Sequence, residues 1–303
     1  MNTASLHRLI AGLSLLLASA HAGAQPYPTK PVLIVVPFAV GGSTDIVARI
    51  LANELTQSLA KQVLVENRTG GGGVIGWGHV ARAAPDGYTL LAQELSFAIA
   101  AGLIPNLPYD PRKSFAPITT AASVPHVMVV HPAVKAKTVS ELIALAKANP
   151  GKLLYGSGGN GTNTHLGGEL FKSLAGVDLL HVPYKGAGAV LTDLLGGQVQ
   201  MLVSSLTTTL PHIKSGKLRA LVTLDEKRAA VLPDVPVARE VGLASFVMLF
   251  WVNFAAPAST PQPIIERLNK ELIAALATPD TKKRLIDLGL DSVGSTPAQA
   301  AKL

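Results

Sequence analysis

The sequence predicts an α/β protein made of two similar units. Continuous runs of β-branched and apolar residues, such as Val32 to Val36, indicate strands that are buried on both faces. Such a run leads into a glycine-rich loop and then a helix twice, once through residues 37–45 and once through residues 155–171. Strand and helix patterns alternate around both segments, which is typical of a largely parallel sheet covered by helices.

In the first unit, a helix is expected after residue 42, because Val47, Leu51 and Leu55 recur at helical spacing. Each residue from Ser43 to Asp45 has a side chain that can cap its first turn. The pattern then predicts a strand over residues 63–65, a helix from the glycines at 70–73 up to residue 83, a turn at 86–87 and a strand over residues 88–91.

The second unit begins after a turn-rich stretch, with two expected strands, one near Ile118 and one over residues 127–130. Thr138 to Glu141 form a capping box that opens a helix ending before Pro150. The helix after the second glycine loop is expected to end at Gly176. Later elements are a strand over 179–182, a helix over 187–195, strands over 199–203, over 218–224 and near 250–255, and helices beginning at 260–261 and 278–279.

Composition and charge argue against several functions. The 303 residues carry 26 basic and 19 acidic side chains, spread along the chain with no basic run and no interleaved aromatic residues, so no nucleic-acid partner is expected. The chain has no cysteine, which excludes disulfides, thiolate metal sites and cysteine nucleophiles. No cofactor and no metal site are expected.

The first 24 residues have the layout of a secretory signal peptide. Arg8 precedes an apolar stretch over residues 9–20, and the small residues Ala22, Gly23 and Ala24 follow as a cleavage site. The stretch is shorter than the roughly 20 residues that a membrane-spanning helix needs, which argues against the alternative of a membrane anchor. We expect cleavage near Ala24 and a mature protein in the periplasm.

The two glycine loops are candidate anion sites. A helix N-terminus offers free N–H donors and the positive end of the helix dipole, and glycine lets a ligand approach the backbone closely. If the two units face each other, both loops meet in one cleft and can hold a small anion without a charged side chain. The alternative is that each loop only connects a strand to a helix.

Catalytic and cofactor motifs are weak by comparison. The spacing G-x-G-x-x-G occurs at 71–76 and 156–161, but neither copy has the acidic residue expected after the next strand of a dinucleotide site. No Walker loop and no G-x-S-x-G elbow occur. His165 and Glu169 are spaced for metal ligation but are read as polar residues on a helix surface, and no set of residues stands out as a catalytic triad. We therefore expect binding and not catalysis.

Ordered segments along nearly the whole chain resemble one family. They are YPTKP at 27–31, PFAVGGSTD at 37–45, VENR at 65–68, PDGYTL at 85–90, LPYDP at 107–111, YGS at 155–157 with HL at 165–166, HVPYKG at 181–186 and LLGGQ at 194–198. Together they resemble the Bug-type solute receptors, which are the extracytoplasmic substrate-binding components of tripartite tricarboxylate transporters.

The resemblance implies a two-lobed, type II-like periplasmic binding protein, or Venus flytrap, that closes over a small carboxylate. It places lobe 1 at residues 25–125 and 246–303 and lobe 2 at 126–245, with hinge segments near 121–126 and 244–250 that cross between them. The ligand-binding residues that it implies are Phe38, Gly42, Ser43, Thr44, Asp45, Ser157, Gly158, Gly161, Thr162 and Ser204. Expected partners are the ligand and membrane transporter subunits, and a monomer is expected.

Several positions depart from the family pattern. Glu94 stands where small or hydroxyl residues are usual, and a carboxylate there would repel a second carboxylate of the ligand unless it is protonated or turned away. Ser204 replaces part of a usual Asp-Asn pair, and the chain ends about one helix earlier than expected. The sequence therefore does not identify the ligand.

Two other functions are also compatible with the sequence, an exported hydrolase of small acids and a ligand-binding partner of a sensor.

Overall fold

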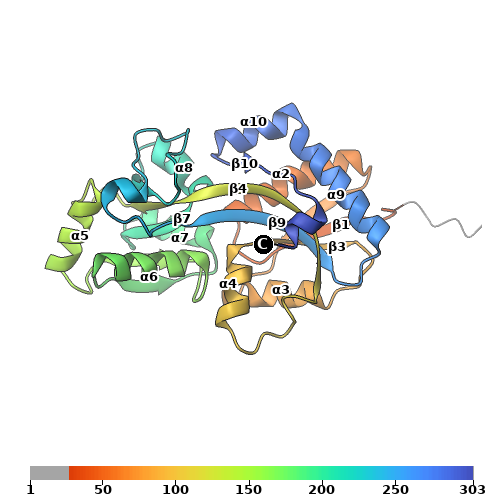
Figure 1. Ribbon diagram of the computed structural model, residues 1–303, viewed down its shortest axis with the longest axis horizontal. Coiled ribbons are helices and arrows are strands. Elements are labelled where there is room, and N and C mark those ends of the chain that lie inside the picture. Colours follow the sequence, from red (N-terminus) through yellow and green to blue (C-terminus); the bar gives the residue numbers. More distant parts are fainter. Residues whose placement is uncertain (1–26, 303) are drawn as a thin grey trace, which may run out of the picture.

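The computed structural model describes residues 27–302, so the predicted signal peptide lies outside the described residues. Figure 1 shows two groups of helices and strands side by side. Two long strands, β4 (Phe115–Val130) and β9 (Leu249–Pro257), run from one group into the other. We call the group at the right of Figure 1 the first lobe and the group at the left the second lobe.

The first lobe is a mixed sheet with helices on both faces. Strands β1 (Val32–Val36), β2 (Val63–Asn67) and β3 (Thr89–Glu94) are parallel, in the order β2-β1-β3, and β9 then pairs antiparallel with β3. The short strand β10 (Asp291–Ser292) pairs with β4. The helices are α2 (Ser43–Ser58), α3 (Val74–Ala81), α4 (Leu95–Leu103), α9 (Gln262–Ala277), α10 (Pro279–Asp287) and α11 (Pro297–Ala300).

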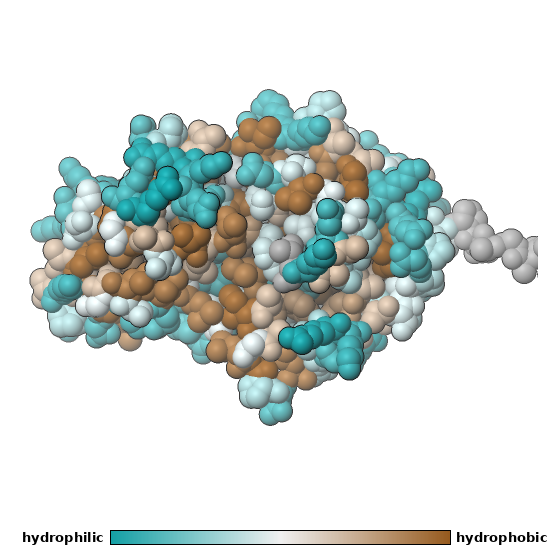
Figure 2. Space-filling view, in the orientation of Figure 1, coloured by the Kyte–Doolittle hydropathy of each residue, from teal (hydrophilic) through white to brown (hydrophobic). Residues whose placement is uncertain are grey.

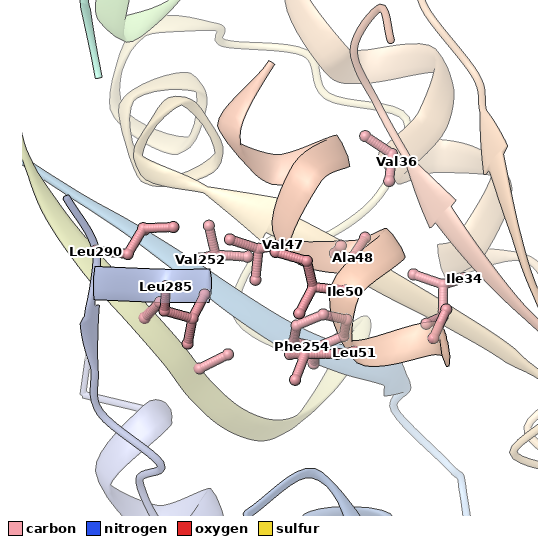
Figure 3. Packing of buried hydrophobic residues seen from close by; sticks show 14 of the residues in the cluster. Ile34, Val36, Val47, Ala48, Ile50, Leu51, Val252, Phe254, Leu285 and Leu290 are labelled. Carbon is pink, nitrogen blue, oxygen red and sulfur yellow. The ribbon is translucent and has the colours of Figure 1, made fainter. Parts of the chain in front are cut away.

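The helices on both faces of the sheet explain the apolar run of β1. Ile34 and Val36 are buried in the cluster that α2 and α9 complete, and Figure 3 shows both residues with side chains of α2, β9 and α10. Val35 points the opposite way, into a second cluster that contains Trp77 of α3. Because successive side chains of a strand alternate between faces, a strand covered on both sides needs an uninterrupted apolar run.

The second lobe repeats this plan. Strands β5 (Leu154–Ser157), β6 (Leu180–Pro183) and β7 (Met201–Ser205) are parallel in the order β7-β5-β6, while β8 (Arg219–Thr223) and β7 both pair antiparallel with the end of β4. Its helices are α5 (Val139–Ala148), α6 (Asn163–Ala175), α7 (Ala187–Leu195) and α8 (Leu206–Lys214). Short 3-10 turns, η2 (Gly71–Gly73) and η3 (Ala238–Val241), complete the fold.

The change of partners along β4 marks the junction of the lobes. Pro125 still pairs with Leu249 of β9, and the next residue, His126, pairs with Ser205 of β7. The predicted limits of the two lobes stay a prediction, but this is where β4 passes from one sheet to the other. In the view of Figure 2, hydrophobic residues gather on the surface along this junction, whereas hydrophilic residues cover much of the two far ends.

Most predicted elements are confirmed, and several expectations are wrong. β1 and α7 have the predicted bounds, and α6 ends at Gly176, whose φ is 59°. The two strands expected near Ile118 and over 127–130 are one 16-residue strand, β4. The capping box expected from Thr138 to Glu141 is only half formed, because Thr138 accepts from the Glu141 N–H but Glu141 accepts from the Lys137 N–H. Helices α4, α8 and α11 and strand β10 were not predicted. The N-cap of α2 is Gly42, with Ser43, Thr44 and Asp45 inside the first turn, so none of these three residues caps it.

One stability prediction follows from helix α6. A Cβ at Gly168 would lie 2.2 Å from the ring of Tyr155, which is fully buried. Gly168→Ala should therefore lower the free energy of unfolding by about 1–3 kcal/mol, as overpacking does, although alanine is the better helix former. The control is Gly102→Ala in α4, where a Cβ meets nothing within 4 Å. This variant should raise the free energy of unfolding by up to about 1 kcal/mol. Urea unfolding curves measure both, and a Gly168→Ala protein as stable as the parent would contradict the packing.

Candidate functional site

A pocket lies between the two lobes and holds about 390 Å³ of space free of protein atoms, part of it open to solvent. All but one of its lining residues follow or end a strand, at the carboxyl edge where ligands of open α/β sheets bind. The first lobe provides Phe38, Ala39, Gly42, Ser43, Thr44, Asp45, Glu94 and Ser96, the second provides Gly158, Thr162, Asn163, Thr164, Ala187, Ser204, Ser205 and Thr208, and β9 adds Phe250.

Helices of both lobes begin at this pocket. The first turns or caps of α2, α4, α6, α7 and α8 are all in the lining. Among the described residues, no acceptor is found for the backbone N–H of Thr44 in α2 or of Thr164 in α6. Unpaired N–H groups and the positive ends of helix dipoles favour a negative charge, so the pocket is suited to an anion.

Hydroxyl groups join the two lobes at the pocket. The Ser43 N–H donates to Thr208 Oγ1 at 3.1 Å, and the hydroxyls of Ser43 and Thr208 lie 3.0 Å apart. The Ser205 hydroxyl is hydrogen-bonded to that of Ser43 and lies 3.2 Å from that of Thr208. We call these three residues the hydroxyl cluster. Nearby, the Ala39 N–H donates to the Lys185 carbonyl at 3.0 Å, so the cleft is closed in this structure.

Asp45 lines the pocket, but its carboxylate is engaged within the first lobe. It accepts hydrogen bonds from Gly41 N–H at 3.0 Å, from Arg49 Nε at 3.0 Å and from Asn67 Nδ2 at 2.9 Å. Asn67 Nδ2 also donates to the carbonyl of Phe38 at 2.9 Å. The Asp45 side chain therefore holds the loop between β1 and α2 in shape, and its charge is balanced by Arg49.

Glu94 belongs to a buried network that connects both lobes with the strand β4. It is the N-cap of α4, and its Oε2 accepts from the Ser96 N–H at 2.9 Å and from Asn163 Nδ2. Asn163 Oδ1 lies 3.1 Å from His126 Nε2, and His126 Nδ1 lies 3.2 Å from the Met248 carbonyl. Burial raises the pKa of Glu94 to about 7 and lowers the pKa of His126.

The structure brings together all of the predicted site residues except Ser157 and Gly161. Ser157 is fully buried beside the pocket, where its hydroxyl accepts from the Gly159 N–H at 3.1 Å and shapes the loop. Gly161 faces the first lobe, and a Cβ there would lie 3.2 Å from Leu103. Sequence reasoning missed several lining residues, of which Ser205 and Thr208 were hidden because α8 was not predicted. The missed residues are Ala39, Ser96, Asn163, Thr164, Ala187, Ser205, Thr208 and Phe250.

One serine–histidine pair bears on the alternative of a hydrolase. Ser157 Oγ lies 2.6 Å from His181 Nε2, and burial lowers the pKa of His181 to about 4. Among residues 27–302, no carboxylate is hydrogen-bonded to His181, and Ser157 does not line the pocket. The pair therefore lacks the orienting group and the access to substrate of a nucleophile and base.

Neither a metal site nor a membrane-spanning helix is found in the described part of the chain. His165 and Glu169 do not form a metal site, because no group of three potential ligands lies together there. Glu169 instead accepts from Tyr155 and from Lys172. None of the helices in residues 27–302 combines the length and the apolar character needed to cross a membrane.

The raised pKa of Glu94 predicts a pH-dependent penalty on stability. In the unfolded chain the carboxyl group loses its proton near pH 4.3, but in the folded protein only near pH 7, so the penalty grows as pH rises through this window. Glu94→Gln removes the ionisation, and its stability relative to the parent should increase between pH 5 and pH 8 by up to about 3 kcal/mol.

The control for this experiment is Glu141→Gln, in the first turn of α5 and outside the pocket. It replaces an exposed carboxyl group by an amide and should not reproduce the gain in stability that Glu94→Gln shows between pH 5 and pH 8. Denaturant unfolding at a series of pH values measures the difference, and parallel profiles for the parent and Glu94→Gln proteins would contradict the buried carboxyl group.

Comparison with known proteins identifies the family. The model of the tripartite tricarboxylate transporter family receptor matches residues 47–303. Protein BugT of Bordetella pertussis is 38% identical over 301 residues, and the match covers 97% of this chain and 92% of that protein. The matched region includes both lobes, which confirms the resemblance found in the sequence.

Solved structures of related proteins have the same fold as this chain. The periplasmic binding protein BugD has a TM-score of 0.88 and 39% sequence identity, with 91% of this chain and 93% of that chain covered. MatC from Rhodopseudomonas palustris, solved with bound malate, has a TM-score of 0.88 and 34% identity, with 91% and 95% covered. These likenesses confirm the two-lobed fold of a periplasmic binding protein. The chain belongs to the tripartite tricarboxylate transporter receptor family, whose members are solute-binding receptors and not enzymes.

Proposed function

We propose that this receptor captures one small organic carboxylate between its lobes and releases it unchanged to membrane subunits of a transporter. The observation that carries the proposal is the pocket itself, where helices of both lobes begin and where hydroxyl and N–H groups face a common space. No lysine, arginine or histidine is among the described lining residues. A related receptor, MatC, was solved with malate, which is a carboxylate.

Backbone donors are strong enough for this task. Each helix N-terminus contributes about 0.3–1 kcal/mol to holding an anion, and up to about 2 kcal/mol when partly buried. Several such ends, together with charge-assisted hydrogen bonds from hydroxyl groups, reach the roughly −8 kcal/mol of a micromolar complex. In our proposal the Thr44 and Thr164 N–H groups and the Thr44 hydroxyl bind the carboxylate, whereas Asp45, Ser157 and Gly161 hold the loops.

Access to the site requires the lobes to separate. The two long strands, β4 and β9, are the connections that cross between the sheets, so we propose that they bend near Pro125 and Leu249. Opening breaks the contacts between Ser43 and the other two residues of the hydroxyl cluster, and it separates Glu94 from Asn163. A ligand held by both lobes then favours the closed form, because only that form presents all of the donors.

The partners of the receptor follow from its family. We propose a periplasmic monomer that docks on the membrane subunits of a tripartite transporter. A receptor that reports to a sensor would have the same pocket, and binding of the purified protein to transporter or sensor subunits would separate the two functions. A hydrolase is not proposed, because the Ser157–His181 pair lies outside the pocket lining.

Ligand binding should be visible as thermal stabilisation. A ligand at a hundredfold excess over its Kd adds about 2.7 kcal/mol to the free energy of unfolding. For a chain of this size that raises the Tm by about 4–5 °C. A screen by differential scanning fluorimetry should find this shift for a small carboxylate and not for its methyl ester or amide. If no carboxylate in a broad panel shifts the Tm, the proposed function is wrong.

Closure can be blocked without touching the ligand. A Cβ at Gly188, in the first turn of α7, would lie 2.2 Å from the Val40 carbonyl of the first lobe. Gly188→Ala should thus leave the open protein as stable as the parent, because alanine favours a helix, but weaken ligand binding at least tenfold. Calorimetric titration measures the loss, with Gly102→Ala as the control that should bind normally. Unchanged affinity of Gly188→Ala would show that the lobes do not approach at this point.

A further inference from the structure

The pocket contains a carboxylate with an unused acceptor. Glu94 is 2% exposed and lines the pocket. Both of its hydrogen bonds, from the Ser96 N–H and from Asn163 Nδ2, go to Oε2. No donor to the other oxygen, Oε1, is found among residues 27–302. Oε1 is not among the described atoms that are both shut off from open space and unpaired, so it faces the pocket, where a ligand can donate to it.

A second polar group in the same pocket is also unpaired. Ser204 is fully buried at the end of β7, and its hydroxyl has no hydrogen-bond partner within the described residues. It lines the pocket together with Glu94. Nearly all buried hydroxyl groups in folded proteins are hydrogen-bonded, so this hydroxyl, in the same pocket as Glu94 Oε1, indicates a ligand with polar atoms that reach both.

The charges of the pocket decide what kind of polar atom fits. Its charged lining residues are Asp45 and Glu94, and the charge of Asp45 is balanced by Arg49. Glu94 has no cation beside it in the lining. A second carboxylate of a ligand would therefore meet a like charge in a buried place, whereas a hydroxyl or ammonium group would donate to Oε1.

We propose that Glu94 makes this receptor selective for a small acid that has one carboxylate and, at its other end, a hydrogen-bond donor such as a hydroxyl or ammonium group. The inference rests on the proposed function, since it assumes that the first carboxylate lies at the helix N-termini. Glu94 Oε1 accepts from the donor, and the Ser204 hydroxyl completes the contact. Dicarboxylates are disfavoured.

Helix capping alone does not explain this residue. The N-cap role needs one acceptor oxygen, and serine, threonine or aspartate supply it at lower desolvation cost than a buried glutamate. Glu141, near the start of α5, shows the ordinary case, because the hydroxyl of Thr138 caps that helix and the glutamate stays at the surface. Glu94 is buried instead, with one oxygen left over in the ligand space.

The test compares four acids of equal length by calorimetric titration at pH 8. The acids are 4-hydroxybutanoate, 4-aminobutanoate, succinate and butanoate, with the five-carbon series as a second set. The parent protein should bind at least one of the two donor-bearing acids tenfold or more tightly than succinate and butanoate. The relative affinities for 4-hydroxybutanoate and 4-aminobutanoate show whether the preferred donor is a hydroxyl or an ammonium group. Glu94→Gln, which keeps the shape and the capping oxygen, should lose this preference by at least tenfold, and Glu141→Gln should keep it.

Two outcomes would overturn the inference in different ways. If succinate binds the parent as tightly as the donor-bearing acids, or if Glu94→Gln leaves the ratio unchanged, the selectivity is wrong and carboxylate capture stands. If no acid of either length binds the parent, the selectivity is wrong, and the proposed function fails with it only when the broad carboxylate panel also gives no shift in Tm.

Discussion

The donors that the cleft offers to an anion come from the backbone, because α2, α6, α7 and α8 begin where the strands before them end. Parallel strands place their carboxyl ends at one edge of a sheet, and the two sheets turn these edges toward each other. The positions of the N–H groups in the first helical turns are therefore fixed by the packing of the helices on the two sheets. Close approach of the lobes requires small residues at the contact, and a Cβ at Gly186 would lie 2.7 Å from the backbone nitrogen of Ala39.

Such a site leaves specificity to a few side chains. Backbone donors recognise a carboxylate but do not distinguish one acid from another, so side chains of the pocket must do so. One of these side chains is Glu94, a buried acid that burial destabilises. A buried acid that is costly to the fold is expected at functional positions, where binding of the ligand offsets the cost. The hydroxyl of Ser204 fits the same interpretation.

The regular part of the fold and the loops of the site could be predicted from the sequence, but not the pocket residues at the start of α8. The alternating strands and helices, the run of β1 and the glycine at the end of α6 follow from local rules. Helix α8 contains three consecutive threonines and Pro211, which disfavour a helix, and tertiary packing overrides this preference. The pairing of Ser43 with Ser205 joins positions that are 162 residues apart, which no local pattern reveals.

The network behind Glu94 links the ligand pocket to the strand that crosses between the lobes. With an ionised Glu94, Asn163 presents its NH2 group to the carboxylate and its oxygen to the Nε2–H of His126. With a protonated Glu94, the amide can turn over, and the proton of His126 moves to Nδ1, where the Met248 carbonyl at 3.2 Å accepts it. The second arrangement pairs all of these groups, whereas the first leaves the unprotonated Nδ1 of His126 opposite the Met248 carbonyl. A donor on the ligand favours the first, and the bound solute thereby sets the hydrogen bonding where β4 meets the segment before β9.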